Sequence, residues 1–358
     1  MCNIAGYVGP KRAAPILIEM TRRQQFMDGG VCTGIATIHE GKLYYAKVVG
    51  DVDTLLRETD AANFPGTVGI MHSRPGGNIA AHAHPFVDRS GNLAIVTNGT
   101  MPATATEEYL IQERDIMQDF MDRGFPIHTC SERGAVKPLS NGLKYHPCEP
   151  WALFLGEAAA KRLDDLENGM LDGMAQTLDT FPGDRIIVSV HALLDGVITV
   201  GRMTRPMVAG LCEDETYIAT TEMAFPEGVR CRNIVPLPTC SVSQVKAGSL
   251  HISNRTLRNI RVEEITPHVY AAAYNHLENL LTGAKDDPKS IYDFNLGPVI
   301  EPLWSEPHVD CKYAVEGKYL KPSAALSYEV LAAFYREGRL HSVVGERGGV
   351  LRTKFWLE

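Results

Sequence analysis

Residues 1–9 read M-C-N-I-A-G-Y-V-G, a cysteine directly after the initiator methionine and then an apolar run typical of a β-strand. Because cysteine is small, we expect Met1 to be removed, which leaves Cys2 with a free α-amine. An α-amino group has a pKa of about 7.7–8.0, so part of it is neutral near pH 7 and can accept a proton. Cys2 could therefore supply both a thiol nucleophile and the base that activates it. Its position alone is weak evidence, so the interpretation depends on the rest of the sequence.

Further segments extend this pattern along the chain. They are R-R-Q-Q-F with G-I-A (residues 22–36), H-S-R (72–74), A-H-P (83–85), N-G (98–99), and R-P-M-V-A-G with Y-I-A-T-T-E (205–222). With residues 1–9 they resemble, in order and spacing, the class II glutamine amidotransferases, N-terminal nucleophile hydrolases that include glucosamine-6-phosphate synthase and glutamine phosphoribosylpyrophosphate amidotransferase. The resemblance covers roughly residues 2–260. It implies an enzyme whose Cys2 attacks the side-chain amide of glutamine and releases ammonia through a γ-glutamyl thioester.

The resemblance also implies a fold. Residues 2–262 are expected to form a four-layer αββα N-terminal nucleophile hydrolase domain of the α+β class, and residues 263–358 a small C-terminal α+β extension. The residue patterns themselves suit sheets covered by helices. They predict strands at 3–8, 67–71, 93–97, 207–211 and 217–220, hairpins at 34–49 and 186–203, and helices at 15–27 and 106–122. From Trp151 onward they predict one longer helix, with Leu163 and Leu178 on its apolar face.

The pattern changes after residue 262. A helix is predicted near 269–281, and the stretch Gly283–Pro288 is rich in turn-forming and charged residues, which is typical of a linker. A helix at 324–337 followed by a glycine-rich hairpin at 343–357 could form a winged-helix module. No sugar-isomerase or phosphoribosyltransferase domain is recognisable in this region. The acceptor of the ammonia is therefore left open, and another protein could supply it.

Three residues carry the chemistry that the resemblance implies. Arg74 follows an apolar strand, and the matching residue of the family holds the α-carboxylate of glutamine, as a guanidinium can through two parallel hydrogen bonds. Asn98 and Gly99 follow another strand, and the matching pair forms the oxyanion hole. A developing oxyanion needs preorganised donors, which a side-chain amide and a backbone N–H can provide. The alternatives are a surface arginine and an ordinary Asn-Gly turn.

Four other residues are considered for weaker roles. His84 matches a His-Pro pair of the family and is expected to line the glutamine site or to support it, while His72 is expected to be scaffolding. His82 and His84 would share one face of a strand and invite a metal site, but no further ligand follows at a typical spacing. We therefore predict no metal and no cofactor. Glu132 is the counterpart of the family's acidic residue that receives the substrate's α-amine, with a surface salt bridge as the alternative.

The sequence departs from the family directly after Arg74. The residues P-G-G-N at 75–78 stand where the family has W-A-T-H-G or a near variant, so the aromatic and hydroxyl groups of the glutamine pocket are missing. Two alternatives to glutamine hydrolysis follow. The chain could be an amidohydrolase of the same nucleophile class that acts on another small amide. It could also be a non-catalytic regulatory or binding module that keeps the fold.

Charge and composition argue against several other classes of protein. A formal net charge of −8 argues against nucleic-acid binding, which needs a concentrated basic surface. No apolar stretch approaches the roughly 20 residues that span a bilayer, and the start does not resemble a secretory signal. The eight cysteines include no Cys-x-x-Cys pair and are expected to be reduced thiols of a cytoplasmic protein. The expected partners are glutamine as substrate, an acceptor protein and a second copy of the chain in a homo-oligomer.

Overall fold

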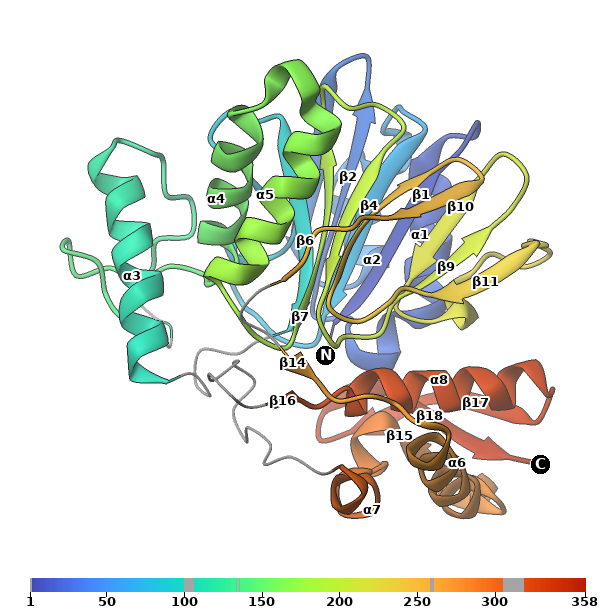
Figure 1. The fold of residues 1–358 in the computed structure, drawn as a ribbon. Coiled ribbons are helices and arrows are strands. Elements are labelled where there is room, and N and C mark those ends of the chain that lie inside the picture. The colour runs from blue at the N-terminus through green and yellow to red at the C-terminus, as the bar shows by residue number, and fades with distance from the viewer. Residues whose placement is uncertain (1, 100–105, 133, 135, 258–260, 305–318) are drawn as a thin grey trace.

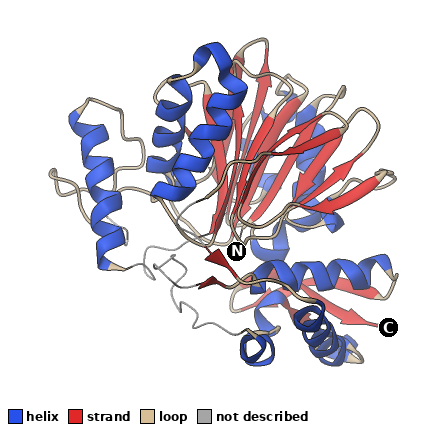
Figure 2. Cartoon of the chain, in the orientation of Figure 1, coloured by secondary structure: helices blue, strands red, loops and turns tan. Residues whose placement is uncertain are grey.

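The computed structural model describes residues 2–99, 106–132, 134, 136–257, 261–304 and 319–358 (Figure 1). Two antiparallel sheets stack face to face, and helices cover the outer face of each sheet (Figure 2). The predicted αββα arrangement of the α+β class is confirmed. A further group of helices and strands, from Pro267 to Leu357, lies against one end of this sandwich, below it in Figure 1.

The N-terminal strand occupies the middle of the first sheet. This sheet has seven strands in the order β11-β9-β10-β1-β4-β2-β3. Their bounds are Asn3–Val8 (β1), Cys32–His39 (β2), Lys42–Val49 (β3), Val68–Arg74 (β4), Val208–Leu211 (β9), Thr216–Ala219 (β10) and Asn233–Pro236 (β11). The second sheet has six strands in the order β13-β12-β8-β7-β6-β5. Their bounds are Phe86–Val87 (β5), Leu93–Gly99 (β6), Arg185–His191 (β7), Ile198–Arg202 (β8), Ser241–Lys246 (β12) and Ser249–Ile252 (β13).

The main core lies between the inner faces of the two sheets. It includes Ile4, Ile70, Val96, Val188 and Val200, all fully buried. Every residue of β1 and β7 is buried. A strand that is covered on both faces needs an almost continuous apolar sequence, which explains why these two strands could be recognised from sequence.

Helices form the two outer layers. The helices α1 (Ala13–Asp28) and α2 (Val52–Glu58) cover the seven-stranded sheet, and α4 (Glu149–Ala160) and α5 (Leu166–Thr180) cover the six-stranded sheet (Figure 1). The helix α3 (Glu107–Asp122) packs beside α4, and the Thr106 hydroxyl caps it by accepting a hydrogen bond from the Tyr109 N–H. Single 3-10 turns are η1 (Ala61–Asn63), η2 (Ala80–His82), η4 (Leu163–Asp165), η5 (Glu222–Ala224), η6 (Ala284–Asp286), η7 (Ile291–Asp293) and η8 (Glu301–Leu303).

The prediction of one long helix after Trp151 was wrong. The chain leaves the helical conformation after Ala160 and starts again at Leu166, so α4 and α5 pack against each other as an antiparallel pair. Leu163, which was placed on the buried face, is 60% exposed. The break contains five charged residues. In a continuous helix some of them would face the sheet, whereas a turn lets them reach solvent. They are Lys161, Arg162, Asp164, Asp165 and Glu167.

The C-terminal region has a hydrophobic core of its own. Its elements are α6 (Pro267–Leu281), β15 (Lys289–Ser290), α7 (Gly297–Ile300), α8 (Ser323–Arg336), β17 (Leu340–Arg347) and β18 (Val350–Leu357), and the strands form a sheet in the order β15-β18-β17. The core contains Leu277, Phe294, Leu331 and Phe355, with Met27 from the end of α1 packed among them. Two short strands, β14 (Arg261–Val262) and β16 (Tyr319–Leu320), pair in parallel between this region and the sandwich. The predicted linker at Gly283–Pro288 contains only the turn η6.

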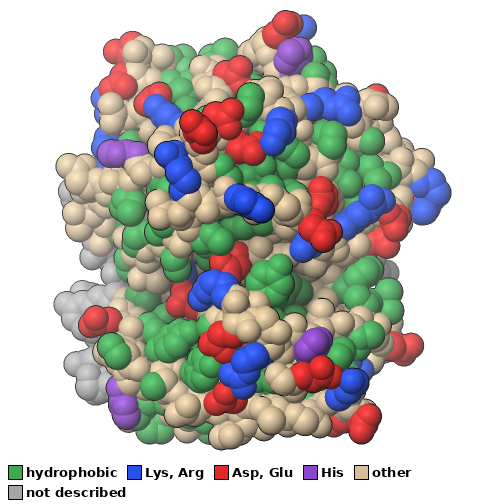
Figure 3. All heavy atoms as spheres, turned by 90° about the vertical axis from the view of Figure 1, so that its right-hand side faces the viewer, with side chains coloured by type: hydrophobic (Ala, Val, Ile, Leu, Met, Phe, Trp, Pro, Cys, Tyr) green, Lys and Arg blue, Asp and Glu red, His purple; other side chains and the backbone are tan. Residues whose placement is uncertain are grey.

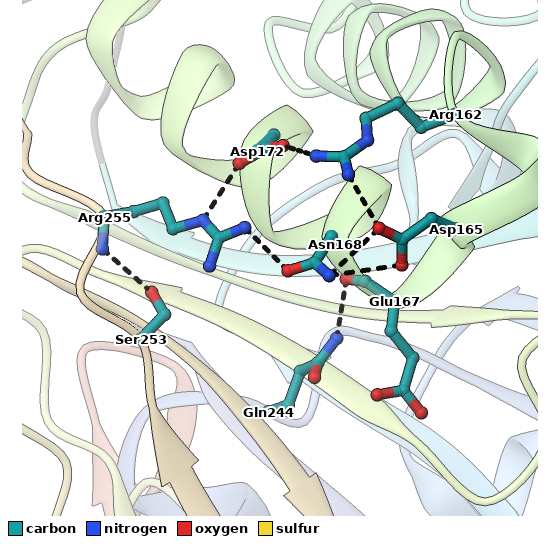
Figure 4. A network of polar contacts seen from close by, with 8 residues as sticks. All are labelled: Arg162, Asp165, Glu167, Asn168, Asp172, Gln244, Ser253 and Arg255. Carbon is teal, nitrogen blue, oxygen red and sulfur yellow. Dashed lines mark hydrogen bonds and ion pairs between the residues drawn. The ribbon is translucent and has the colours of Figure 1, made fainter.

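A polar network fastens α5 to the second sheet and to the segment after it (Figure 4). Asp172 accepts hydrogen bonds from Arg162 and, at 2.9 Å, from Arg255 Nε, while Arg255 Nη2 also donates to Asn168 at 2.7 Å. Burial alone would raise the pKa of Asp172, but the hydrogen bonds from Arg255 and Arg162 outweigh it and hold the pKa below its usual value. Asp172 is therefore ionised in the folded protein and joins two arginines from separate segments.

Replacing Asp172 by alanine is expected to lower the free energy of unfolding by about 1 kcal/mol, a modest loss because the side chains are partly exposed. The difference in unfolding free energy between the variant and the unaltered protein should reach its full size above about pH 4. It should vanish as the pH falls through the lowered pKa of Asp172, because only the carboxylate form stabilises the fold. Urea unfolding at several pH values measures it. Asp119→Ala, which removes an exposed partner of Arg123, is the control and should change stability by less than about 0.5 kcal/mol.

The surface carries no dominant charge on the face drawn in Figure 3. Basic, acidic and hydrophobic side chains are interspersed there over both the sandwich and the C-terminal region. Within the described residues, no helix is both long and apolar enough to cross a membrane.

Candidate active site

Strand register places Cys2 and Arg74 at the same edge of the first sheet. β1 and β4 are antiparallel neighbours, and their last pair is Asn3 with Ser73. The next residues outward are Cys2 on one strand and Arg74 on the other. Cys2 is partly exposed there, and the apolar strands behind both residues are buried. The sequence alone predicted both residues but not that they would be opposite each other.

Asn98 reaches this edge from the second sheet. It lies near the end of β6 with only 2% of its surface exposed, and its Nδ2 donates a hydrogen bond to the Cys2 carbonyl oxygen at 3.0 Å. Gly99 follows with a positive φ of 150°. A Cβ at Gly99 would lie 2.4 Å from the Asp184 carbonyl oxygen, so only glycine fits at this position. The structure therefore brings Cys2, Arg74, Asn98 and Gly99 to one place.

The Arg74 guanidinium is held by groups from two loops. Its Nη1 donates to the His82 carbonyl oxygen at 2.8 Å and lies 2.8 Å from His146 Nε2. The P-G-G-N segment folds back over the same arginine, and a Cβ at Gly77 would lie 2.8 Å from Cys32 Sγ and 3.9 Å from Arg74 Cζ. These contacts leave Nη2 and Nε of Arg74 as the donors that can face a carboxylate ligand.

Three buried histidines, His72, His84 and His146, lie near Arg74 and are neutral. The rings of His72 and His84 lie 3.9 Å apart, and His84 Nδ1 accepts a hydrogen bond from the Thr97 N–H of β6 at 3.2 Å. Burial lowers the pKa of His72 to about 3 and that of His84 well below its usual value. For His146, burial and then the charge of Arg74 lower the pKa strongly, so its Nε2 lone pair is available to accept from the guanidinium.

Lys47 pins the loop that carries these histidines. Its Nζ donates to the carbonyl oxygens of Ala81, Ala83 and Pro85 at 3.0–3.2 Å and lies 5.0 Å from the centre of the Phe86 ring. All three ammonium protons are thus used. Burial lowers the pKa of Lys47 to about 8. The loop that presents the His82 carbonyl to Arg74 is therefore fixed from β3.

Glu132 makes no described contact with this group. Glu132 is exposed, and among the described residues no hydrogen bond or ion pair joins it to Arg74, Asn98 or Cys2. The part of its loop that reaches the site is Thr129, whose carbonyl oxygen lies 2.9 Å from His82 Nε2 and whose hydroxyl accepts the His146 N–H at 2.8 Å. The buried carboxylate of Glu149 holds Thr129 by accepting its N–H at 3.1 Å. The role of Glu132 stays a prediction.

His82 and His84 do not point at a common ligand position. His82 bonds to Thr129, whereas His84 bonds to Thr97 and stacks in the interior. In the ranges that the structure describes, no group of three His, Cys, Asp or Glu side chains is placed to hold a metal ion.

Three residues that contact Arg74 or its neighbouring loop were not predicted from the sequence. His146, Thr129 and Lys47 lie far from Arg74 in sequence and belong to no motif, although each contacts its loop or its guanidinium directly. The local sequence around His146, K-Y-H-P-C, contains a His-Pro pair like that at residues 84–85. That second His-Pro pair is the signal by which His146 could have been found from sequence.

Comparisons with known proteins were made with the whole chain. No family model matches it. A glutamine–fructose-6-phosphate aminotransferase (isomerizing) of Streptomyces coelicolor is 26% identical over 308 residues, which cover 84% of this chain and 45% of that protein. The protein of the same name from Thermosynechococcus vestitus is 27% identical over 228 residues, 63% of this chain and 32% of its own. That from Pyrococcus horikoshii is 36% identical over 102 residues, 28% of this chain and 17% of its own.

Solved structures show the same fold at lower identity. The glutamine phosphoribosylpyrophosphate amidotransferase of B. subtilis has a TM-score of 0.55 and 15% identity, over 78% of this chain and 57% of that chain. A structure described as the allosteric regulatory enzyme of purine biosynthesis also scores 0.55, with 16% identity over 80% of this chain and 58% of that one. The chain spans less than half the length of the three curated relatives it matches.

Proposed function

We propose that this chain, which belongs to the class II glutamine amidotransferase family, is an enzyme that uses Cys2 to hydrolyse an amide and releases ammonia. The observation that supports the proposal best is that Cys2, Asn98 and Arg74 lie at the same edge of the two sheets. The Asn98 amide bonds to the Cys2 main chain at 3.0 Å, and Arg74 lies opposite Cys2 across the sheet. A nucleophile, an oxyanion donor and a carboxylate receptor are thus close enough to act on one small substrate.

The proposed reaction converts glutamine and water into glutamate and ammonia. The Cys2 α-amine accepts the thiol proton, and the sulfur attacks the side-chain carbonyl carbon. The second N–H of the Asn98 amide and the Gly99 N–H stabilise the oxyanion. The C–N bond then breaks, and the α-amine returns the proton to the departing ammonia. Water, deprotonated by the same amine, hydrolyses the γ-glutamyl thioester and frees Cys2.

The residues around Arg74 are proposed to orient it for substrate binding. Neutral His146 and the His82 carbonyl orient Arg74 towards the α-carboxylate, and His84 joins β4 to β6 from the interior. We assign His84 to positioning, because it is 3% exposed and its Nδ1 is occupied by Thr97. We further propose that residues 2–262 form the amidotransferase domain, that residues 263–358 form a winged-helix-like unit, and that another protein supplies the ammonia acceptor.

Glutamate release from glutamine tests the proposal, with protein whose intact mass shows that Met1 is absent. Arg74→Gln is expected to raise KM for glutamine about 10- to 100-fold with a smaller change in kcat, because it removes hydrogen bonds to a charged group of the bound substrate. Glutaminamide, which lacks the α-carboxylate, is the matched control and should be hydrolysed equally by both proteins. An equal loss on both substrates would mean that Arg74 is only scaffolding.

A second candidate is hydrolysis of a different small amide. It is supported by the altered loop after Arg74, where P-G-G-N replaces the aromatic and hydroxyl residues of the family. A panel of asparagine, glutamine, glutaminamide and short aliphatic amides separates the candidates. Faster turnover of an amide without an amino-acid head group would favour the second.

A further inference from the structure

The C-terminal unit has the element order of a winged helix but does not expose its third helix. Helix, strand, two helices and a hairpin follow one another, with the sheet order β15-β18-β17. In DNA-binding proteins of the helix-turn-helix type, the recognition helix enters the major groove with an exposed face. Here α8 is buried along most of its length, including Leu326, Tyr328, Leu331 and Phe334. This helix is used for packing within the chain.

One contact of the unit is made with the turn between α1 and β2. The Tyr292 hydroxyl donates a hydrogen bond to the Asp28 carboxylate, and Arg352 Nη1 donates to the Gly29 carbonyl oxygen at 3.3 Å. The Arg352 guanidinium lies 5.4 Å from the centre of the Tyr292 ring, so the two side chains support each other. Asp28 is fully buried and Arg352 is 6% exposed, whereas Tyr292 covers them from the surface with 44% of its own area exposed.

The same turn is bonded to the strands that carry Cys2 and Arg74. The Gly30 N–H donates to Ser73 Oγ at 2.8 Å, and Ser73 directly precedes Arg74. On the other side, Asn3 Nδ2 donates to the carbonyl oxygens of Gln24 and Gln25 at the end of α1, at 2.8 and 3.1 Å, and Asn3 directly follows Cys2. The turn therefore bonds the residue next to Arg74, and the end of α1 directly before the turn bonds the residue next to Cys2.

A second contact joins α8 to the turn η5, which follows the strand β10 next to β1. Arg336 Nη1 forms an ion pair with the buried Glu222 carboxylate at 2.7 Å. Between α8 and the first sheet lies a cavity of about 140 Å³, lined in part by Thr220 and Tyr328. Thr220 Oγ1 accepts the Ile4 N–H at 2.9 Å, so this wall is two residues from Cys2. Burial is the main cause of the raised pKa of Tyr292 and Tyr328, and the negative charge of a Cys2 thiolate contributes in both.

From these contacts we infer that residues 266–357 act as a positioning unit for the catalytic edge. Tyr292 and Arg352 hold the turn Asp28–Val31. This turn bonds Ser73, and the end of α1 directly before it bonds Asn3, so docking of the unit positions Cys2 and Arg74. This inference rests on the proposed role of Cys2 as the nucleophile. Tyr292 and Arg352 are positioning residues, because neither touches the reacting atoms.

Two substitutions test the inference in the full chain. Tyr292→Phe removes the hydroxyl that bonds Asp28, and Arg352→Gln removes the guanidinium at Gly29. Each is expected to lower kcat/KM for amide hydrolysis about 5- to 30-fold and to raise the rate of Cys2 alkylation by iodoacetamide at least about 3-fold, because a loosened turn uncovers the thiol. Alkylation is located by mass spectrometry of the N-terminal peptide.

Arg339→Gln is the matched control. Arg339 pairs with Glu278 at 2.7 Å inside the same unit and makes no described contact with the turn at Asp28. Its turnover and alkylation should stay within about 2-fold of the unaltered protein. Equal changes in all three variants, or no change in Tyr292→Phe and Arg352→Gln, would overturn the inference. If the unaltered protein hydrolyses no amide, the proposed function fails, but the alkylation rates still decide whether the unit controls Cys2.

Discussion

Cys2→Ala is expected to lower amide turnover at least about 10⁴-fold, the largest effect of any single substitution in the chain, because it removes the attacking atom. Cys32 also lies at this edge, opposite Arg74 on β2, but its thiol is buried, whereas the Cys2 thiol is partly exposed and belongs to the residue that carries the α-amine. The protein should otherwise stay folded, because Cys2 is partly exposed and outside β1. Glutamate formation measured over hours gives the residual rate.

A second cysteine supplies the control for this experiment. Cys231→Ser changes a free thiol just before β11, which the strand register places at the Val8 end of the first sheet and so at the end opposite to Cys2, and it should leave turnover within about 2-fold. Cys2→Ser is informative as well, because a hydroxyl keeps the shape but is a far weaker nucleophile at neutral pH. Turnover that persists in Cys2→Ala would show that another group performs the reaction, and the mechanism above would be withdrawn.

Asn98→Ala is expected to lower kcat about 100- to 1,000-fold with little change in KM, the next largest effect. The amide is buried, its Nδ2 already bonds to the Cys2 carbonyl oxygen, and its second N–H remains for the oxyanion. Such a donor acts mainly in the transition state, so kcat and kcat/KM should fall together. Steady-state kinetics with the best amide substrate measures both.

The rate of Cys2 alkylation distinguishes two roles for Asn98, donation to the oxyanion and positioning of the Cys2 thiol. Reaction with iodoacetamide forms no oxyanion on the substrate, so Asn98→Ala should alkylate at nearly the normal rate if the amide serves the transition state. Asn92→Ala, the same substitution in the turn before β6, should leave both rates unchanged. A tenfold change in the alkylation of Asn98→Ala would instead mean that the Asn98 bond to Cys2 only positions the thiol.

The central strands were predictable because burial on both faces leaves little choice of residue. Asn3–Val8 was predicted with the bounds that β1 has, and the predicted strand at 93–97 lies within β6. Strands with one polar face were missed. Ser241–Lys246 alternates serine and valine weakly, and Asn233–Pro236 is largely exposed, so neither has a distinctive pattern. Their pairing depends on neighbours that a linear pattern does not contain.

The site was predictable to the extent that it follows local sequence. Cys2, Arg74, Asn98 and Gly99 stand at strand ends within recognisable motifs, and the structure places them together. His146, Tyr292 and Arg352 could not be found in this way, because each contacts the site through tertiary packing over a long separation in sequence. Glu132 was matched from a motif as well, and because it is exposed and makes no described contact with these residues, its role stays a prediction.

The contact between Arg352 and Gly29 spans 323 positions of sequence. A ribosome adding about 5–20 residues per second needs roughly 15–65 s to cover that separation. During this interval the growing polypeptide carries a thiol whose supporting turn has no partner. If the C-terminal unit positions Cys2 as inferred above, the site is completed only after β18 has emerged from the ribosome, and Cys2 of a partly synthesised chain is inactive until then.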